Sequence, residues 1–186
     1  PSEDNRAAHI LADLTSADAS AQLKELIAGK TVTVCGNAPS LKTELSKIRG
    51  RIIAADAASG VLVRSGITPD VIVTDLDGIE DDALELNNNG TVLVVHAHGD
   101  NIARINSWVP RIKGPLILTT QSRPFGHVYN FGGFTDGDRA VFLAHEMQAS
   151  EVRLIGFDLD DPNVPPMKRG KLKWARRLLS ACGHDI

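Results

Sequence analysis

Short apolar runs alternate with amphipathic segments along most of the chain. The runs are continuously apolar, which is typical of parallel strands that helices cover on both faces. They predict strands at 31–35, 51–55, 71–74, 91–96, 116–119 and 152–157. Helical spacing predicts helices at 40–48, 57–64, 80–88, 101–109, 138–148 and near 172–179. We therefore expect a doubly wound, Rossmann-like α/β fold, with a mostly parallel sheet and helices on both faces.

The two ends of the chain follow other patterns. Residues 1–30 have helical spacing that ends at Gly29, so we expect a short N-terminal helical segment before an α/β domain at 31–186. Residues 160–170 contain three prolines and a glycine and predict an extended loop. The chain begins at Pro1 and not at Met, so we expect its numbering to start inside a longer protein.

Composition excludes several classes of protein. With 186 residues and 42% hydrophobic content, the chain can bury roughly 70% of its unfolded surface as one domain. Its longest apolar runs fall far short of the ~20 residues that span a bilayer. A net charge of -3 gives no general reason to expect nucleic acid or an anionic membrane as partner. Two cysteines without CxxC spacing suit a reducing cytoplasm.

The small net charge conceals an uneven distribution. Residues 69–100 hold eight acids and no Lys or Arg, whereas residues 168–177 hold six bases and no acid. The acids at two predicted strand ends suggest a cation site, and the others suit a neighbouring helix. The basic run has three interpretations, as a helix over bound phosphates, a contact with another subunit, or a solvated face.

Ligands of such folds bind outside the carboxyl ends of the strands, so the residues that follow each strand are the candidates. After the first strand, Gly36 permits a tight turn and Pro39 occupies a first helical position, which leaves backbone N–H groups for a phosphate. Neither GxxxxGK[ST] nor GxGxxG is present. Ordinary turn chemistry therefore remains an equal alternative for this segment.

Two carboxylates follow the third predicted strand. Asp75 and Asp77 are two residues apart, which places their side chains on one face of extended backbone. With no basic residue in the segment, they repel each other unless a cation lies between them. Carboxylate oxygens suit Mg²⁺, which keeps waters and nucleotide phosphates as its other ligands. The alternative is that Asp77 caps the following helix, but capping does not explain Asp75.

The fourth strand leads into a second polar cluster, His96-Ala97-His98-Gly99-Asp100. Asp100 can complete a metal shell or cap the next helix. His96 and His98 can face phosphates or act as acid and base near neutral pH. An HxH pair also permits zinc, although no third His or Cys follows at a convincing spacing.

A glycine-rich stretch at 120–139 follows the fifth strand. Structureless loops of this length are usually functional. The stretch holds three of the five Phe residues and the only Tyr, mixed with Gln, Asn and Arg. Such side chains can stack on a flat heterocycle and hydrogen-bond its edges. The alternative is a lid that its own aromatic residues pack.

Three segments together resemble one family. Residues 69–78, 96–101 and 130–139 closely resemble the archaeal-type 6-hydroxymethyl-7,8-dihydropterin pyrophosphokinases, which are related to the catalytic domain of thiamine pyrophosphokinases. The resemblance runs from about Val32 to the C-terminal helix. It implies transfer of pyrophosphate from ATP, with Mg²⁺, to the hydroxymethyl group of the pterin, with release of AMP. The product would serve tetrahydromethanopterin or folate synthesis.

The resemblance and the chemistry of the residues agree on roles for three groups. The expected Mg²⁺ ligands and catalytic residues are Asp75, Asp77 and Asp100, with His98 as a further catalytic residue that would orient the hydroxyl. The expected nucleotide-binding residues are Gly36, Asn37, Ser40, Asp56, Gly132, Gly133, Asp138 and Arg139. The expected pterin-binding residues are Gln121, Asn130 and Asp136. Sites of the related thiamine enzymes lie between subunits, which by analogy makes a homodimer the expected assembly.

Two other functions remain open at this point. The strand that ends in Asp75-Leu76-Asp77-Gly78 is also similar to the nucleophile motif of haloacid dehalogenase phosphatases, in which Asp75 would form an aspartyl-phosphate. In that class the motif normally opens the chain and a Thr follows the Gly, where this chain has Ile79. The other alternative is a nucleotide-binding module without catalysis.

Overall fold

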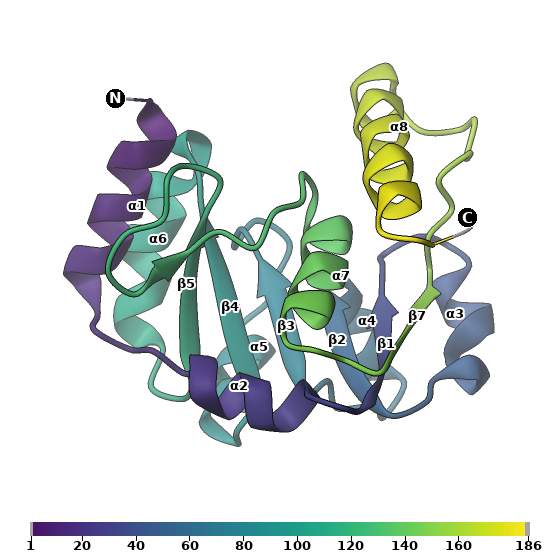
Figure 1. Cartoon of the computed structure of the whole chain (residues 1–186), viewed down its shortest axis with the longest axis horizontal. Helices are drawn as coiled ribbons and strands as arrows, with labels where there is room; N and C mark the ends of the chain where they lie inside the picture. The colour runs from purple at the N-terminus through teal and green to yellow at the C-terminus, as the bar shows by residue number, and fades with distance from the viewer. Residues whose placement is uncertain (1, 185–186) are drawn as a thin grey trace.

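A computed structural model describes residues 2–184 and confirms the doubly wound α/β fold (Figure 1). All seven strands form one sheet, and every strand pair is parallel, in the order β6-β5-β4-β3-β2-β1-β7. The strands are β1 (Thr31–Cys35), β2 (Arg51–Ala55), β3 (Val71–Thr74), β4 (Val92–Ala97), β5 (Leu116–Thr120), β6 (Val128–Tyr129) and β7 (Glu151–Ile155).

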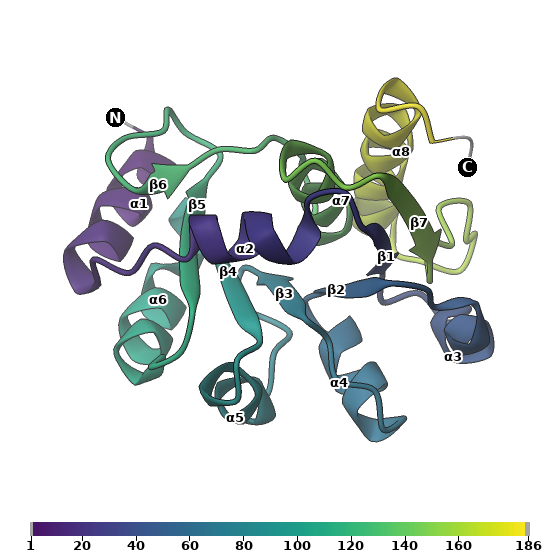
Figure 2. The same ribbon diagram turned by 60° about the horizontal axis from the view of Figure 1, so that its bottom comes forward.

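Helices cover both faces of this sheet (Figure 2). One apolar core lies beneath α1 (Glu3–Leu14), α3 (Leu41–Glu44), α4 (Ala58–Arg64), α5 (Asp82–Asn88) and α6 (Ile102–Trp108). The other lies beneath α2 (Ser20–Ile27), α7 (Asp136–Glu146) and α8 (Pro166–Ala181). Three short 3₁₀ helices complete the described elements, η1 (Leu45–Lys47), η2 (Gly99–Asn101) and η3 (Val109–Arg111).

The continuous apolar runs of the strands follow from this arrangement. In β4, Leu93 and Val95 point into the first core, whereas Val92 and Val94 point into the second. Successive side chains of a strand face opposite sides of the sheet, so a sheet with two covered faces requires apolar residues at every position. The predicted strands therefore agree with the structure to within one or two residues.

Two elements differ from the prediction. Strand β6 lies inside the glycine-rich stretch and has only two residues, so it is too short to show a periodic pattern. Helix α8 begins at Pro166, so the predicted loop at 160–170 ends earlier. Proline suits the first turn of a helix because the N–H that it lacks has no helical partner there.

The N-terminal helices contribute to the same two cores. Leu11 of α1 belongs to one core, and Leu23 and Ile27 of α2 belong to the other. A division between 1–30 and 31–186 stays a prediction. Within residues 2–184, no helix has both the length and the apolarity that crossing a bilayer demands. Cys35 and Cys182 are free thiols.

The strand order creates a crevice between β1 and β7. The chain leaves β1 toward α3 on one face of the sheet and leaves β7 toward α8 on the other. In open α/β sheets, neighbouring strands whose connections diverge in this way leave room for a ligand at their carboxyl ends. The fold therefore places a binding site beside the turn after β1.

Candidate active site

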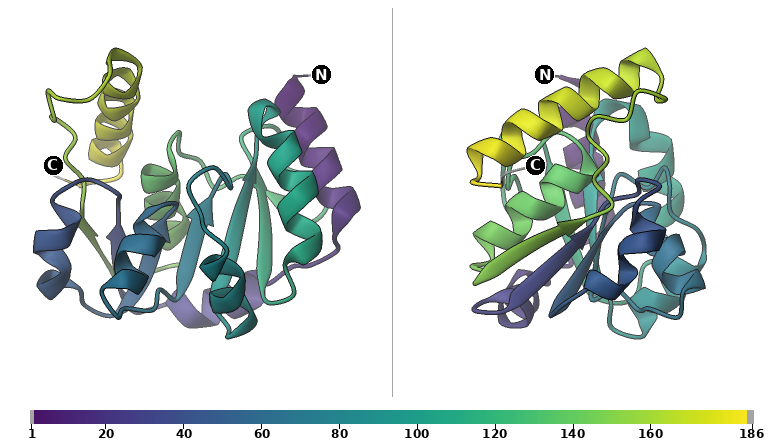
Figure 3. Two further views of the ribbon diagram at one scale, coloured as in Figure 1. Left: turned by 180° about the vertical axis from the view of Figure 1, so that it is seen from behind. Right: turned by 90° about the vertical axis from the view of Figure 1, so that its right-hand side faces the viewer.

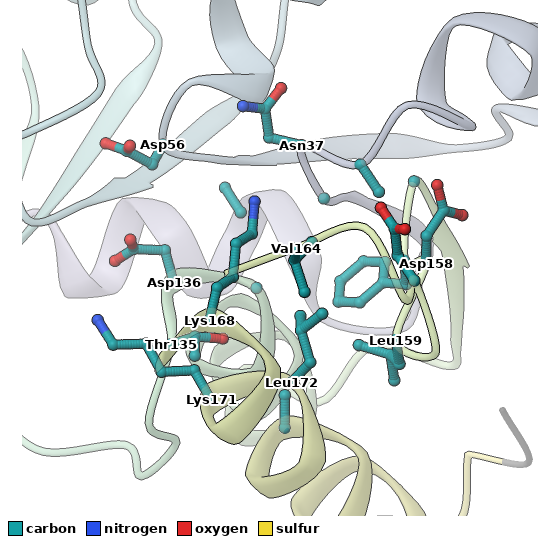
Figure 4. A pocket seen from close by; sticks show the side chains of 18 of the residues that line it. Asn37, Asp56, Thr135, Asp136, Asp158, Leu159, Val164, Lys168, Lys171 and Leu172 are labelled. Atoms are coloured by element: carbon teal, nitrogen blue, oxygen red, sulfur yellow. The ribbon is translucent and has the colours of Figure 1, made fainter. Parts of the chain in front are cut away.

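A cavity of about 550 Å³ occupies this crevice (Figure 4). Its walls are the turn after β1, Asp56 at the end of β2, the first turn of α7, the loop after β7 and the start of α8. Among the residues expected at a nucleotide or substrate, Gly36, Asn37, Asp56 and Asp136 line it. The volume falls within the range of small-molecule sites.

The turn after β1 packs tightly against the loop after β7. A Cβ atom on Gly36 would overlap the carbonyl oxygen of Gly156, so this glycine allows two backbones to meet. The N–H of Gly36 donates to the last residue of β7 at 2.9 Å, and the N–H groups of Ala38 and Ser40 donate to the loop that follows, both at 3.1 Å. The expectation that the turn leaves its N–H groups free was therefore wrong for these three residues. Figure 4 shows the side chain of Asn37, from this turn, at the cavity wall.

Three carboxylates meet at the edge of the cavity. Asp56 follows β2, Asp75 follows β3, and Asp136 is the first residue of α7. One carboxylate oxygen from each lies within 4.8 Å of the other two. Within residues 2–184, they form the one group of three or more His, Cys, Asp or Glu side chains that could share an ion. We call Asp56, Asp75 and Asp136 the acidic cluster.

Electrostatic repulsion is strong in the acidic cluster. Burial, followed by the Asp75 and Asp56 carboxylates, raises the pKa of Asp136 well above its usual range. Burial also raises the pKa of Asp56, although a hydrogen bond from Thr74 opposes this effect. A divalent cation relieves such repulsion, and three carboxylates are the hard oxygen donors that Mg²⁺ prefers. The donor set therefore fits a magnesium ion.

The turn after β3 separates Asp75 from Asp77. Leu76 is buried and has φ of 73°, in the left-handed region that non-glycine residues rarely adopt. The backbone is therefore not extended at this point, contrary to the premise on which the two carboxylates were expected to share one face. Asp77 is exposed and lies 3.6 Å from Nε of Arg104. It does not cap α5, which begins only at Asp82.

Asp56 is held against the same turn. Its Oδ1 accepts hydrogen bonds from the hydroxyl of Thr74 at 2.6 Å and from the N–H of Gly78 at 3.2 Å. A Cβ atom on Gly78 would overlap Oδ2 of Asp56 and would lie 2.8 Å from its Cγ. The glycine of Asp75-Leu76-Asp77-Gly78 thus makes room for a carboxylate of the neighbouring strand end.

His98 lies beside the acidic cluster. Its Nε2 is 3.5 Å from Oδ2 of Asp75, and its Nδ1 accepts the N–H of Asp100 at 3.3 Å. The bond to Asp75 raises the pKa of His98, and the same bond lowers the pKa of Asp75. Asp100 itself is exposed, lies outside the acidic cluster, and makes no capping bond to α6. The metal roles of Asp77 and Asp100 stay predictions.

Asn101 joins the ends of β3 and β4, a role that the sequence did not predict for it although it ends the segment 96–101. Its amide nitrogen donates to the carbonyl oxygens of Asp75 at 2.8 Å and His96 at 2.6 Å. Its side-chain oxygen accepts the N–H of His98 at 3.1 Å. A buried Asn at the start of a helix is easily interpreted as a turn residue, so the sequence offers no distinguishing signal for this role.

Substituting Asn101 by Ala should lower the free energy of unfolding by roughly 2–3 kcal/mol, because buried carbonyl groups lose their donors. Urea denaturation followed by circular dichroism measures the loss. Asn106 provides a matched control, since its amide donates to a carbonyl within its own exposed helix surface. We expect Asn106→Ala to change the free energy of unfolding by less than about 0.5 kcal/mol. Equal losses in the two variants would contradict the bridging role.

His96 presents a buried hydrogen-bond acceptor without a donor. The Thr119 hydroxyl donates to Val95 O at 3.0 Å, so it accepts at 3.1 Å from Nδ1 of His96. The proton therefore sits on Nδ1 and leaves Nε2 as an acceptor. This Nε2 is buried and has no partner within residues 2–184. Burial lowers the pKa of His96 to about 3, so the ring stays neutral and can accept an N–H from a ligand.

Arg139 belongs to a chain of polar contacts that begins in α1. Arg139 lies on the small cavity that His96 also lines, and it donates to the side-chain oxygen of Gln121 at 3.0 Å. Gln121 in turn donates to Asp4 at 2.8 Å, and Asp4 also accepts the N–H of Gly99 at 2.8 Å. Participation of α1 in the site could not be predicted, because no local sequence pattern marks Asp4.

Several other predicted site residues serve the glycine-rich stretch itself. Asp138 is completely buried, and its carboxylate accepts hydrogen bonds from Phe134 and Thr135 at the start of α7. Gly133 has φ of 89° and lies so close to α7 that a Cβ would be 2.7 Å from the Arg139 nitrogen. Asn130 makes hydrogen bonds within the same stretch. Ser40, in the turn after β1, has a buried hydroxyl without a hydrogen-bond partner in the described chain. The ligand roles of these residues stay predictions.

Arginines from other elements neutralise much of the acidic run at 69–100. The pairs are Arg51–Asp70, Arg64–Glu80, Arg104–Asp77 and Arg111–Asp81, with distances of 2.9, 3.6, 3.6 and 2.6 Å. Asp56 and Asp136 have no basic group within ion-pair distance in residues 2–184. Two members of the acidic cluster beside the cavity therefore have no basic partner in the described residues.

Comparison with known proteins identifies similar chains. A family model described as 6-hydroxymethylpterin diphosphokinase MptE-like matches residues 5–164. Three relatives are each named 6-hydroxymethyl-7,8-dihydropterin pyrophosphokinase. The protein of Pyrococcus furiosus is 45% identical and covers 95% of this chain and 84% of its own. The protein of Methanothermobacter thermautotrophicus is 42% identical, and the match covers 78% of this chain and 71% of that protein. The protein of Methanocaldococcus jannaschii is 35% identical, and the match covers 86% of this chain and 77% of that protein.

Proposed function

The chain belongs to the MptE-like 6-hydroxymethylpterin diphosphokinase family, and from this membership we propose the full reaction that it catalyses. The enzyme is a pyrophosphokinase. It transfers the pyrophosphoryl group of ATP, with Mg²⁺, to the hydroxymethyl group of 6-hydroxymethyl-7,8-dihydropterin and releases AMP. The observation that carries this proposal is a nucleotide-sized cavity with the acidic cluster at its edge. The product serves tetrahydromethanopterin or folate synthesis.

The acidic cluster is the proposed magnesium site. Asp56, Asp75 and Asp136 would hold the ion, and a bound Mg²⁺ would offset the charge that develops on the phosphate oxygens during transfer. The hydrogen bond to His98 lowers the pKa of Asp75, which favours the ionised form that binds a cation. Asp77 and Asp100 are exposed and lie outside the acidic cluster. They are the additional metal ligands that the sequence predicts.

The cavity is the proposed nucleotide site. The turn after β1, with Gly36 and Asn37, and the first turn of α7 both line this cavity, so the proposed nucleotide lies at the crevice of the sheet. Phosphoryl-type transfer depends mainly on positioning and on charge stabilisation, and this chain supplies both from rigid strand ends. His98, beside Asp75, is placed to orient the attacking hydroxyl.

The pterin lies, in this proposal, on the β4–β5 side of the acidic cluster. Gln121, Asn130 and Asp136 provide polar groups for its edges, as the sequence predicts. Nε2 of His96 adds a buried acceptor that a ring N–H can satisfy. A heterocycle with several N–H groups and acceptor nitrogens matches this mixture of donors and acceptors.

The reaction is tested by mass spectrometry of the products formed from ATP, Mg²⁺ and a panel of pterins and thiamine. We expect AMP and the pterin diphosphate in equal amounts, and no AMP when the pterin or Mg²⁺ is omitted. Release of orthophosphate without any pterin would favour the phosphatase interpretation, in which Asp75 is a nucleophile. Nucleotide binding without any product would favour a binding module.

A further inference from the structure

One face of α8 points into the cavity. Lys168, Lys171, Leu172 and Ala175 are spaced at i, i+3, i+4 and i+7, and all four line the cavity wall. Lys173 lies on the same helix but outside the lining. The basic run at 168–177, which the sequence left unexplained, is therefore divided between a cavity face and an outer face.

The two halves of α8 have different surroundings. Ala175 and Leu179 in the second half are buried in the core that α7 shares, so they fix the helix to the domain. Figure 3 shows α8 alongside α7 in the right-hand view. Lys168 and Lys171 lie in the first half, where the helix extends along the cavity and stays exposed. Their position is thus set by a buried anchor and not by contacts of their own.

The charges of these lysines are not neutralised by the protein. Within residues 2–184, neither Lys168 nor Lys171 has a carboxylate within ion-pair distance, whereas Arg176 of the same run pairs with Asp160 at 2.5 Å. Figure 4 shows both lysine side chains extending from α8 into the cavity, on the side where Asp56 and Asp136 lie. The cavity therefore has an acidic edge and a basic wall.

We propose that Lys168 and Lys171 bind the polyphosphate of the nucleotide, so that α8 forms the basic wall of the phosphate site. The inference rests on the proposed function and selects, for two residues of the basic run, the phosphate interpretation that the sequence left open beside two others. A polyphosphate with a cation at the acidic edge still presents anionic oxygens toward the other side of the cavity. Lysine ammonium groups bind phosphate as mobile point charges, which suits side chains that reach into open space.

The double substitution Lys168→Ala/Lys171→Ala tests this role through nucleotide affinity. We expect the Kd for ATP in the presence of Mg²⁺ to rise about tenfold, or about 1.4 kcal/mol, by isothermal titration calorimetry. The rise should be smaller for AMP, because the contribution of the lysines grows with the number of phosphates. It should also shrink at high salt. Lys173→Ala is the matched control, and we expect it to leave both Kd values within twofold.

Other outcomes overturn the proposal. An unchanged Kd for ATP, or equal losses for ATP and AMP, would mean that α8 only shapes or covers the cavity. If the double variant fails to fold, the single variants Lys168→Gln and Lys171→Gln decide by the same criterion. Failure of the proposed function is separate: a wild-type protein that binds ATP through the lysines but forms no pterin diphosphate refutes the reaction and leaves the phosphate site standing.

Discussion

Asp136→Asn is expected to lower kcat/KM for pterin diphosphate formation about a thousandfold, close to 4 kcal/mol of transition-state stabilisation. The substitution keeps the size of the side chain but removes one carboxylate from the acidic cluster. With Asp56 and Asp75 alone, the site has less charge and one fewer oxygen of the kind that Mg²⁺ requires. Steady-state kinetics with saturating ATP and Mg²⁺ measure the loss.

Asp77→Asn and Asp100→Asn are the matched controls for this loss. The metal ligands predicted from the sequence include Asp77 and Asp100, which are not members of the acidic cluster. Only Asp75 belongs to both sets. Asp77 and Asp100 are exposed, and Asp77 already pairs with Arg104. We therefore expect each control to lose no more than about tenfold in kcat/KM. If Asp77→Asn lowers kcat/KM as much as Asp136→Asn does, the result would favour the metal ligands that the sequence predicted over the acidic cluster.

Stability provides a second measure of the Asp136→Asn effect, without catalysis. Mg²⁺ at ten times its Kd should stabilise the wild type by about 1.4 kcal/mol, and this gain should largely vanish in the variant. The folded-state pKa of Asp136 lies above the usual 3.8, so the folded protein holds a proton that the unfolded chain loses. Its metal-free stability therefore falls as pH rises from 3.8 toward that pKa. Asp136→Asn should remove this fall in thermal melts.

The strands and the location of the site could be predicted from the sequence because local patterns determine them. Apolar runs such as β4 are buried on both faces, and the residues that follow each strand necessarily gather at one edge of a parallel sheet. The strand order is a different matter, because it depends on long-range pairing. The crevice between β1 and β7, and with it the cavity, could not be located in advance.

The exact composition of the acidic cluster could not be predicted, for two physical reasons. The left-handed turn at Leu76 breaks the extended geometry that the spacing of Asp75 and Asp77 suggests, and Asp77 pairs with Arg104. Asp136 was expected at the pterin, and only the crossover of α7 from β6 to β7 brings it against Asp75. Contacts between distant segments, including those of Asp4 and Asn101, leave no trace in local periodicity.

Gly78→Ala is expected to reduce kcat/KM about a hundredfold while the protein remains folded. Gly78 has no positive φ, so alanine suits its backbone and the effect is steric. The new Cβ would overlap Oδ2 of Asp56 and lie 3.1 Å from the Cβ of Ala57. Asp56 would have to leave the acidic cluster, and its bonds to Thr74 and Gly78 would break. Steady-state kinetics and urea denaturation measure the two consequences, with an expected stability loss of about 1–3 kcal/mol.

The coupling of Gly78 to Asp56 distinguishes this mechanism from a general disturbance. In a background of Asp56→Ala, the overlap disappears, so adding Gly78→Ala should cost little further stability or activity. Gly170→Ala is the control for glycine replacement, because no atom lies within 4 Å of its added Cβ in α8. We expect it to raise stability by roughly 0.5–1 kcal/mol through helix propensity. Fully additive effects of Gly78→Ala and Asp56→Ala would show that the glycine supports the turn independently of the carboxylate.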